Sequence, residues 1–185
     1  HFEINDMQSY CKKNKKHCYK PHQHSFYQLI WFKSAGKHFV DYEVIEHSED
    51  SFFFLNKGQI HFFCKNSENQ GYLFHFNDIF LLNQDRDLVN KLKYRLFNEI
   101  GHPFVNPLKD EIKEISNLTD YISKEIIDKK FNYKQQVFFL FQSILLKIER
   151  LKRERIPYEK ALDGDYELVV RFKDVIEENI NEFYP

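Results

Sequence analysis

Hydrophobic residues in the first half of the chain fall in short runs. Each run is rich in aromatic or β-branched residues and is bounded by Gly, Asn or Ser, which is typical of strands separated by turns. The runs are FYQLIWF (26–32), KHFVDYEVI (37–45), SFFFL (51–55), IHFFC (60–64) and YLFHF (72–76). Several short strands at near-regular spacing predict a sandwich or a barrel.

The first run is apolar on both of its faces. Side chains alternate along a strand, so every second residue shares a face. One predicted face carries His22, His24, Phe26, Gln28, Ile30 and Phe32, and the other carries Tyr27, Leu29 and Trp31. A strand that is buried on both sides needs a second layer of structure outside the barrel.

The pattern changes near residue 105, where the apolar period becomes helical. Two stripes with three- and four-residue steps predict helices over 107–129 and 134–155. The first stripe is Leu108, Ile112, Ile115, Leu118, Ile122 and Ile126, and the second is Val137, Leu140, Phe141, Ile144, Ile148 and Leu151. A third periodic segment covers about 168–183, after a break at Asp163 and Gly164.

Strands followed by helices predict an α+β fold, a β-barrel with two to three helices packed on it. The expected organisation is a barrel over 1–105, a helical packing or dimerisation region over 106–156, and a linker with a first further helix over 157–185. The helix at 137–151 has an apolar face wide enough for a homodimer, and the residues expected at that interface are Phe138, Phe141, Leu145 and Ile148.

Composition limits the class of protein. The 185 residues include 42% hydrophobic and 17% aromatic residues, enough for a substantial core, and the formal net charge is -1. The chain therefore has no overall basic character for binding nucleic acid directly. No apolar run is long enough to cross a membrane, so we expect no membrane partner.

The three cysteines are Cys11, Cys18 and Cys64. An odd number without CxxC spacing argues against a disulfide framework and against a structural zinc knuckle. The stretch CKKNKKHC, which ends with His17 and Cys18, reads better as a surface hairpin with lysines in its turn than as a metal site. Reduced cysteines favour the cytoplasm.

The histidines of the first half leave three interpretations open. His22 and His24 share a strand face, and His61 follows a turn, so the three imidazoles could hold a divalent metal. The position four after His24 is Gln28, and an amide is a poorer ligand than a carboxylate. The same side chains could line a pocket for a small molecule, or they could be hydrogen-bonded core residues.

No recognisable catalytic motif accompanies these histidines. The chain has no nucleophile elbow, phosphate loop or dinucleotide fingerprint, and its acidic residues gather in loops such as EHSED (46–50). We therefore expect no catalytic residues. His38, His47 and His75 are further histidine candidates, and of these only His75 lies in a strongly apolar run.

The ordered motifs resemble the N-terminal sensor domain of AraC-family transcription regulators. The resemblance is carried by PHQHSFYQLIWFKSAGKHFVDYEVIEHSEDSFFFLNKGQIHFF, followed by GYLFHFNDIFL (71–81) and by YELVVRFKDVIEENINEFYP near the end. It covers most of the chain. It departs from the general cupin metal pattern at Gln28, which stands at the carboxylate position, and at Asn56, which stands where a proline is usual.

The resemblance implies a cupin jelly-roll barrel that binds a small effector, a sugar-like molecule or an aromatic acid. It also implies a cytoplasmic homodimer whose helix-turn-helix units, which alone would contact DNA, would follow residue 185. The residues expected to line the pocket are His22, His24, Phe26, Gln28, Ile30, Val40, Tyr42, His61, Phe63 and His75. No cofactor is expected, except for a possible divalent metal on His22, His24 and His61.

Two other classes of function stay open at this point. The same three histidines could serve a small metal-dependent cupin enzyme, an isomerase or a dioxygenase. A barrel filled by Phe and Trp side chains would instead indicate a structural dimer, since a fold alone does not decide function.

Overall fold

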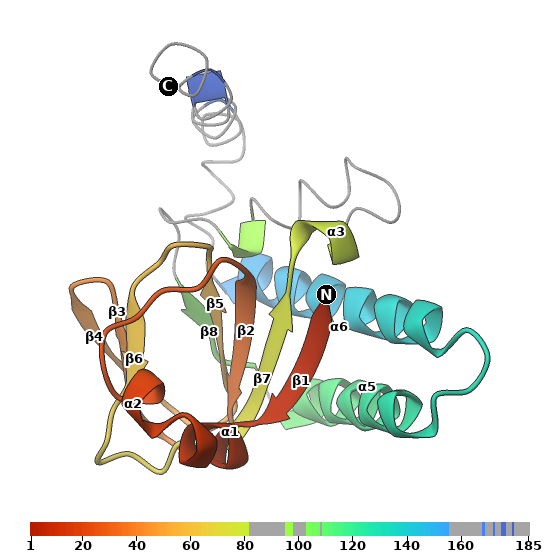
Figure 1. Cartoon of the computed structure of the whole chain (residues 1–185), viewed down its shortest axis with the longest axis horizontal. Helices are drawn as coiled ribbons and strands as arrows, with labels where there is room; N and C mark the ends of the chain where they lie inside the picture. Colours follow the sequence, from red (N-terminus) through yellow and green to blue (C-terminus); the bar gives the residue numbers. More distant parts are fainter. Residues whose placement is uncertain are drawn as a thin grey trace.

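The computed structural model describes residues 1–81, 95–97, 103–107 and 109–155, together with the isolated positions 168, 172, 175, 176 and 179. Two antiparallel sheets and five helices make up these ranges, which is an α+β fold (Figure 1). The larger sheet has the order β1-β7-β2-β5-β8, and the smaller sheet has the order β4-β3-β6. In the described ranges the two sheets do not join into a closed barrel.

The strands of the larger sheet come from distant parts of the chain. They are β1 (Phe2–Asp6), β7 (Gly71–Phe76), β2 (Tyr27–Phe32), β5 (Ser51–Leu55) and β8 (Phe104–Val105). β2 lies between β7 and β5, and Leu29 pairs with Phe74 on one side and with Phe54 on the other. All six residues of β2 are buried, as the two-sided apolar pattern predicts.

The smaller sheet consists of β3 (Gly36–Val40), β4 (Glu43–His47) and β6 (His61–Phe63). The predicted single strand over 37–45 is wrong, because the chain reverses at Asp41 and Tyr42 into the β3–β4 hairpin. Asp41 has a φ of 54°. Aspartate tolerates this left-handed conformation better than most residues, so the turn forms without glycine.

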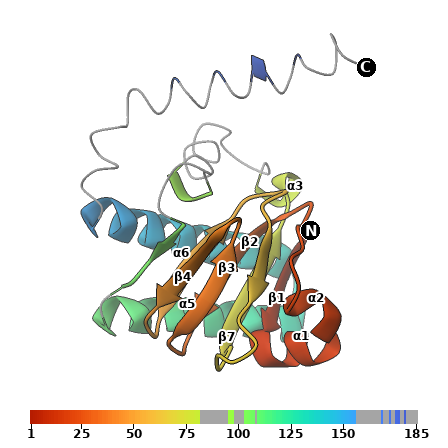
Figure 2. The same ribbon diagram turned by 90° about the vertical axis from the view of Figure 1, so that its left-hand side faces the viewer.

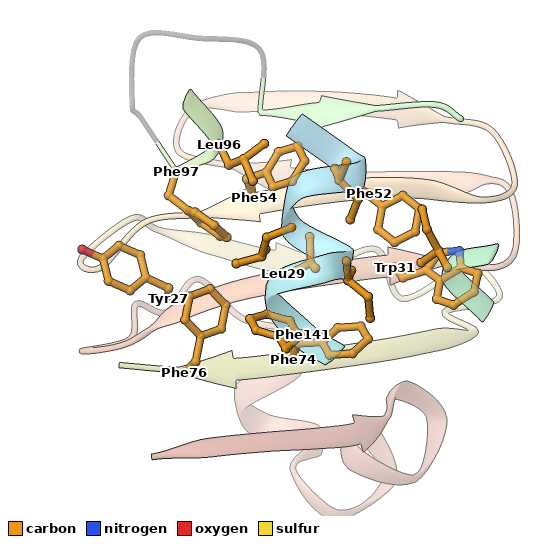
Figure 3. Close-up of a cluster of buried hydrophobic side chains, with 14 of the residues drawn as sticks. Tyr27, Leu29, Trp31, Phe52, Phe54, Phe74, Phe76, Leu96, Phe97 and Phe141 are labelled. Carbon is orange, nitrogen blue, oxygen red and sulfur yellow. The ribbon is translucent and has the colours of Figure 1, made fainter. Parts of the chain in front are cut away.

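Two hydrophobic clusters lie on the two faces of the larger sheet. One fills the space between the sheets and includes Ile30, Phe32, Phe53, Phe63 and Leu73. The other lies between the larger sheet and the helices, where Tyr27, Leu29 and Trp31 meet Phe141 (Figure 3). The predicted division of β2 into two faces is confirmed.

Helices α5 (Lys109–Asp128) and α6 (Tyr133–Arg155) cover the outer face of the larger sheet (Figure 2). Their predicted apolar stripes face the sheet: Ile115 and Ile122 of α5 and Ile144 and Ile148 of α6 are at most 1% exposed. Leu108, the first member of the first stripe, lies outside the described residues, as does most of the predicted segment 157–185. No helix in the described ranges is long and apolar enough to span a membrane.

Residues 7–18 form two short helices, α1 (Met7–Lys13) and α2 (Lys15–Cys18), where the sequence predicted a surface hairpin. Asp6 caps α1 by accepting a hydrogen bond from the backbone N–H of Ser9 at 2.8 Å. Met7, Cys11 and Cys18 are at most 2% exposed and belong to the cluster between the sheets. These buried side chains hold α1 and α2 on the core. The remaining helix, α3 (Asp78–Leu81), follows β7.

Candidate functional site

Four buried polar side chains meet between the two sheets, and we call them the inner polar group. They are Gln28 on β2, His38 on β3, His61 on β6 and His75 on β7. Each is at most 2% exposed. Strand alternation explains their position, because Gln28 lies on the opposite face of β2 from Leu29 and Trp31, which face the helices.

Hydrogen bonds join the inner polar group in two pairs. The Gln28 side-chain N–H donates to Nε2 of His75 at 2.7 Å. Nε2 of His75 therefore accepts, and its other ring nitrogen, Nδ1, carries the proton of the neutral ring. Nδ1 lies 3.9 Å from the carboxylate of Glu3 on β1. The second pair joins Nδ1 of His61 and Nε2 of His38 at 3.3 Å.

Three atoms of the inner polar group have no hydrogen-bond partner among the described residues. They are Oε1 of Gln28, Nδ1 of His38 and Nε2 of His61. An unpartnered buried polar atom costs about 1–3 kcal/mol, so such atoms are uncommon in folded proteins. Three of them therefore lie between the sheets with unused hydrogen-bonding capacity.

Burial keeps the inner histidines neutral. Desolvation lowers the pKa of His38 to about 3 and the pKa of His75 to about 4. The pKa of His61 is also well below its ordinary value, first because of burial and then because of neighbouring histidines such as His38. Neutral imidazoles can each donate and accept one hydrogen bond, which suits recognition of hydroxyl or amide groups.

A second set of rings lies next to the inner polar group and is partly exposed. His22 and His24 precede β2, and the ring centroids are 4.8 Å apart. Phe26 stacks on His24 at 4.5 Å and lies 4.8 Å from the ring of His75. These contacts connect the surface to the buried His75.

Backbone hydrogen bonds fix the segment that carries His22 and His24. His22 and His61 exchange two bonds, from N of His22 to O of His61 at 3.2 Å and in the reverse direction at 2.9 Å. The backbone N–H of Gly58 donates to O of His24 at 2.8 Å. The segment before β2 is therefore attached to β6 and to the turn that precedes it.

The three predicted metal ligands lie near one another, but the most compact group of histidines contains His17 in place of His61. The ring of His61 lies 4.3 Å from that of His22 and 5.2 Å from that of His24. Among the described residues, however, the group whose ligand atoms all lie within 4.8 Å of one another is His17, His22 and His24. Sequence reasoning missed His17 because it assigned residues 11–18 to a hairpin.

Most of the other predicted pocket residues face the interior. Ile30, Val40 and Phe63 are buried in the cluster between the sheets. Tyr42 is the exception: the prediction that it lines the pocket is wrong, because it lies in the β3–β4 turn and is 99% exposed. The turn at Asp41 removes Tyr42 from the face that His38 and Val40 share.

Most of the residues expected at a dimer interface lie in the core between α6 and the larger sheet. Phe138, Phe141, Leu145 and Ile148 are at most 3% exposed within a single chain. Phe141 packs against Phe74 and Phe76 of the sheet at ring distances of 5.6 and 5.0 Å. Side chains buried in this way cannot contact a second copy, so their prediction as interface residues is wrong.

Comparison with known proteins adds no family assignment. A scan against protein-family models finds no match, and a search of curated proteins finds none either. The functional argument therefore depends on the residues and their geometry.

Proposed function

We propose that the chain is the effector-sensing and dimerisation part of an AraC-type transcription regulator. In this proposal the two facing sheets correspond to a cupin-like jelly roll, and a small molecule binds between them. The resemblance of the ordered motifs supports it, and so does the arrangement of a β-sandwich followed by two helices on its outer face. DNA contact would belong to helix-turn-helix units outside the present sequence, in a cytoplasmic protein.

The observation that carries the proposal is the inner polar group with its three unpartnered atoms. A core that served packing alone would be more stable with apolar side chains at these positions. A bound effector would supply the missing hydrogen bonds to Gln28, His38 and His61. The free energy now lost at these atoms would then contribute to binding.

The chemistry of Gln28 narrows the effector class that we propose. Its Oε1 can only accept a hydrogen bond, so the effector must bring an O–H or N–H donor to that atom. A sugar-like molecule carries many such donors, whereas the carboxylate of an aromatic acid carries none. The aromatic rings of Phe26 and His24 would cover an apolar face of the same molecule.

The fold offers a direct route from the effector to the helices. β2 presents Gln28 to the interior and Leu29 and Trp31 to the cluster below α6, so a shift of this strand moves both faces together. Of the apolar residues on α6, Phe139 and Leu146 remain exposed, at 46% and 38%. They are seven residues apart and so share one helix face, which we propose as the dimer contact.

The experiment measures thermal unfolding of the chain in a panel of monosaccharides and aromatic acids. A hydroxyl-rich effector should raise the melting temperature, and the rise should grow with the logarithm of its concentration above the Kd. The Gln28→Leu variant should lose this rise, while Ile127→Ala, at an exposed position of α5, should keep it. If no hydroxyl-rich compound shifts the wild type, or if Gln28→Leu responds as the wild type does, the proposed pocket is refuted.

A small metal-dependent cupin enzyme is the second candidate, an isomerase or dioxygenase. The observation that favours it is the closeness of His22, His24 and His61. Elemental analysis of protein purified without added metal tests it. Stoichiometric iron or manganese that is lost in His61→Ala but kept in His17→Gln would favour the enzyme over the sensor.

A further inference from the structure

His17, His22 and His24 form a triangle of imidazole rings at the surface. The ring centroid of His17 lies 3.9 Å from that of His22 and 5.3 Å from that of His24. His17 belongs to helix α2, whereas the other two precede β2, so the fold brings together side chains from two separate elements.

From this geometry we propose that His17, His22 and His24 bind one divalent transition-metal ion such as Zn²⁺. All three ligand atoms lie within 4.8 Å of one another. Three imidazoles on a tetrahedral ion would hold their nitrogens about 3.4 Å apart. His17 is exposed, so its side chain can adjust its position relative to the other two rings.

The hydrogen bond of His22 prepares its ring for a metal. Nδ1 of His22 lies 2.8 Å from the backbone oxygen of Lys20. A carbonyl oxygen only accepts, so Nδ1 carries the proton and Nε2 keeps a free lone pair. A ring N–H bonded to a backbone carbonyl is the usual support of a metal-binding histidine, because it fixes both tautomer and orientation.

The ligand set also limits the kind of cation. Borderline ions such as Zn²⁺, Co²⁺ and Ni²⁺ prefer imidazole, and three ligands leave one position open.

The surroundings indicate what would fill the open position. No carboxylate belongs to the histidine group within the described part of the chain. The nearby lysines of α1 and α2, which include Lys13, Lys15 and Lys16, are exposed and therefore largely screened by salt. They therefore do not select the fourth ligand, and water or hydroxide would fill the open position.

The site has a structural consequence that is independent of any effector. Cys18, which is 1% exposed, anchors α2 on the core directly next to His17. A metal would therefore join α2 to the segment before β2, and through the His22–His61 backbone pair to β6. Metal binding should stabilise the folded chain by mass action.

The test titrates Zn²⁺ and Co²⁺ into metal-free protein and records stoichiometry, affinity in competition with a chromophoric chelator, and melting temperature. The wild type should bind about one ion per chain, with a higher melting temperature. His17→Gln should lower the affinity at least tenfold, because it removes one of three ligands without disturbing a buried residue. His1→Gln, which removes an exposed histidine outside the group, should bind as the wild type does.

Two results would overturn the proposal. One is the absence of stoichiometric binding to the wild type at micromolar Zn²⁺. The other is equal affinity of His17→Gln and the wild type, which would place any bound ion elsewhere. The Co²⁺ absorption spectrum adds a direct check, since it should change between His17→Gln and the wild type and remain unchanged in His1→Gln.

Discussion

Replacing His38 with Phe should make the chain more resistant to acid. His38 is fully buried, and its ring is surrounded by those of Phe32, Phe53 and Phe63 at 5.3, 5.3 and 5.0 Å. Burial lowers the pKa of His38 from 6.5 to about 3. The folded state therefore keeps this ring neutral, while the unfolded chain protonates it below about pH 6.5.

The sign and size of the effect follow from this difference. The pKa of His38 is lower in the folded state than in the unfolded state. The free energy of unfolding is therefore not reduced by His38 above pH 6.5, and it falls as the pH is lowered below that value. It stops falling below the folded pKa of about 3. By pH 5 the loss that His38 causes is about 2 kcal/mol, since each tenfold change in proton binding corresponds to about 1.4 kcal/mol.

The measurement is urea unfolding at pH 7.5 and pH 5, followed by fluorescence. Trp31 is the single tryptophan and is fully buried, so its emission reports the folded core. His38→Phe should lose about 2 kcal/mol less than the wild type between the two pH values. Phe63→Leu, a core change in the same cluster without a titrating group, should be less stable at both pH values and keep the wild-type difference. Equal losses in the wild type and His38→Phe would refute the reasoning.

Two further pairs of substitutions test the packing of the sheet and of α6. Gly71→Ala should cost more than about 3 kcal/mol, whereas Gly58→Ala should cost about 1 kcal/mol. A Cβ at Gly71, where φ is 137°, would lie 1.8 Å from the backbone oxygen of Trp31, whereas a Cβ at Gly58, where φ is 75°, would face open space. Similar losses of stability for the two variants in urea unfolding would contradict this. Leu145→Ala should cost about 2–5 kcal/mol and Leu146→Ala less than about 1 kcal/mol, because Leu145 is 1% exposed and Leu146 is 38% exposed. The reverse order in the same assay would mean that α6 packs through its other face.

The regular parts of this fold follow from local periodicity. The alternation in β2 fixes which residues face the helices, and the helical steps of Ile115, Ile122, Ile144 and Ile148 fix which sides of α5 and α6 face the sheet. In each case the hydrophobic effect acts on a pattern that is already complete within one segment. These features could therefore be predicted without knowledge of the partner surfaces.

Pairings between distant segments could not be predicted in the same way. β1 pairs with β7 from Phe2↔Phe76 to Asp6↔Tyr72, and nothing local in the first six residues specifies that partner. The hairpin at Asp41 and Tyr42 was missed for a different reason. The turn contains neither Gly nor Pro, and its apolar neighbours continue the strand pattern across it.

The residues behind the metal proposal were harder to predict from the sequence than those behind the effector proposal. Gln28 follows from strand alternation in β2, whereas His22 and His24, which were predicted on the same strand, precede β2 and are placed by backbone hydrogen bonds to His61 and Gly58. His17 depends on α1 and α2, whose only signal is the spacing of Met7, Cys11 and Cys18 at four and seven residues. That spacing is helical, but it is too short to separate a helix from a turn before the core that buries the three side chains is known. The two proposals can therefore be refuted separately. Equal metal affinity of His17→Gln and the wild type would leave Gln28 and its unpartnered oxygen untouched, and an unchanged effector response of Gln28→Leu would leave the imidazoles of His17, His22 and His24 in place.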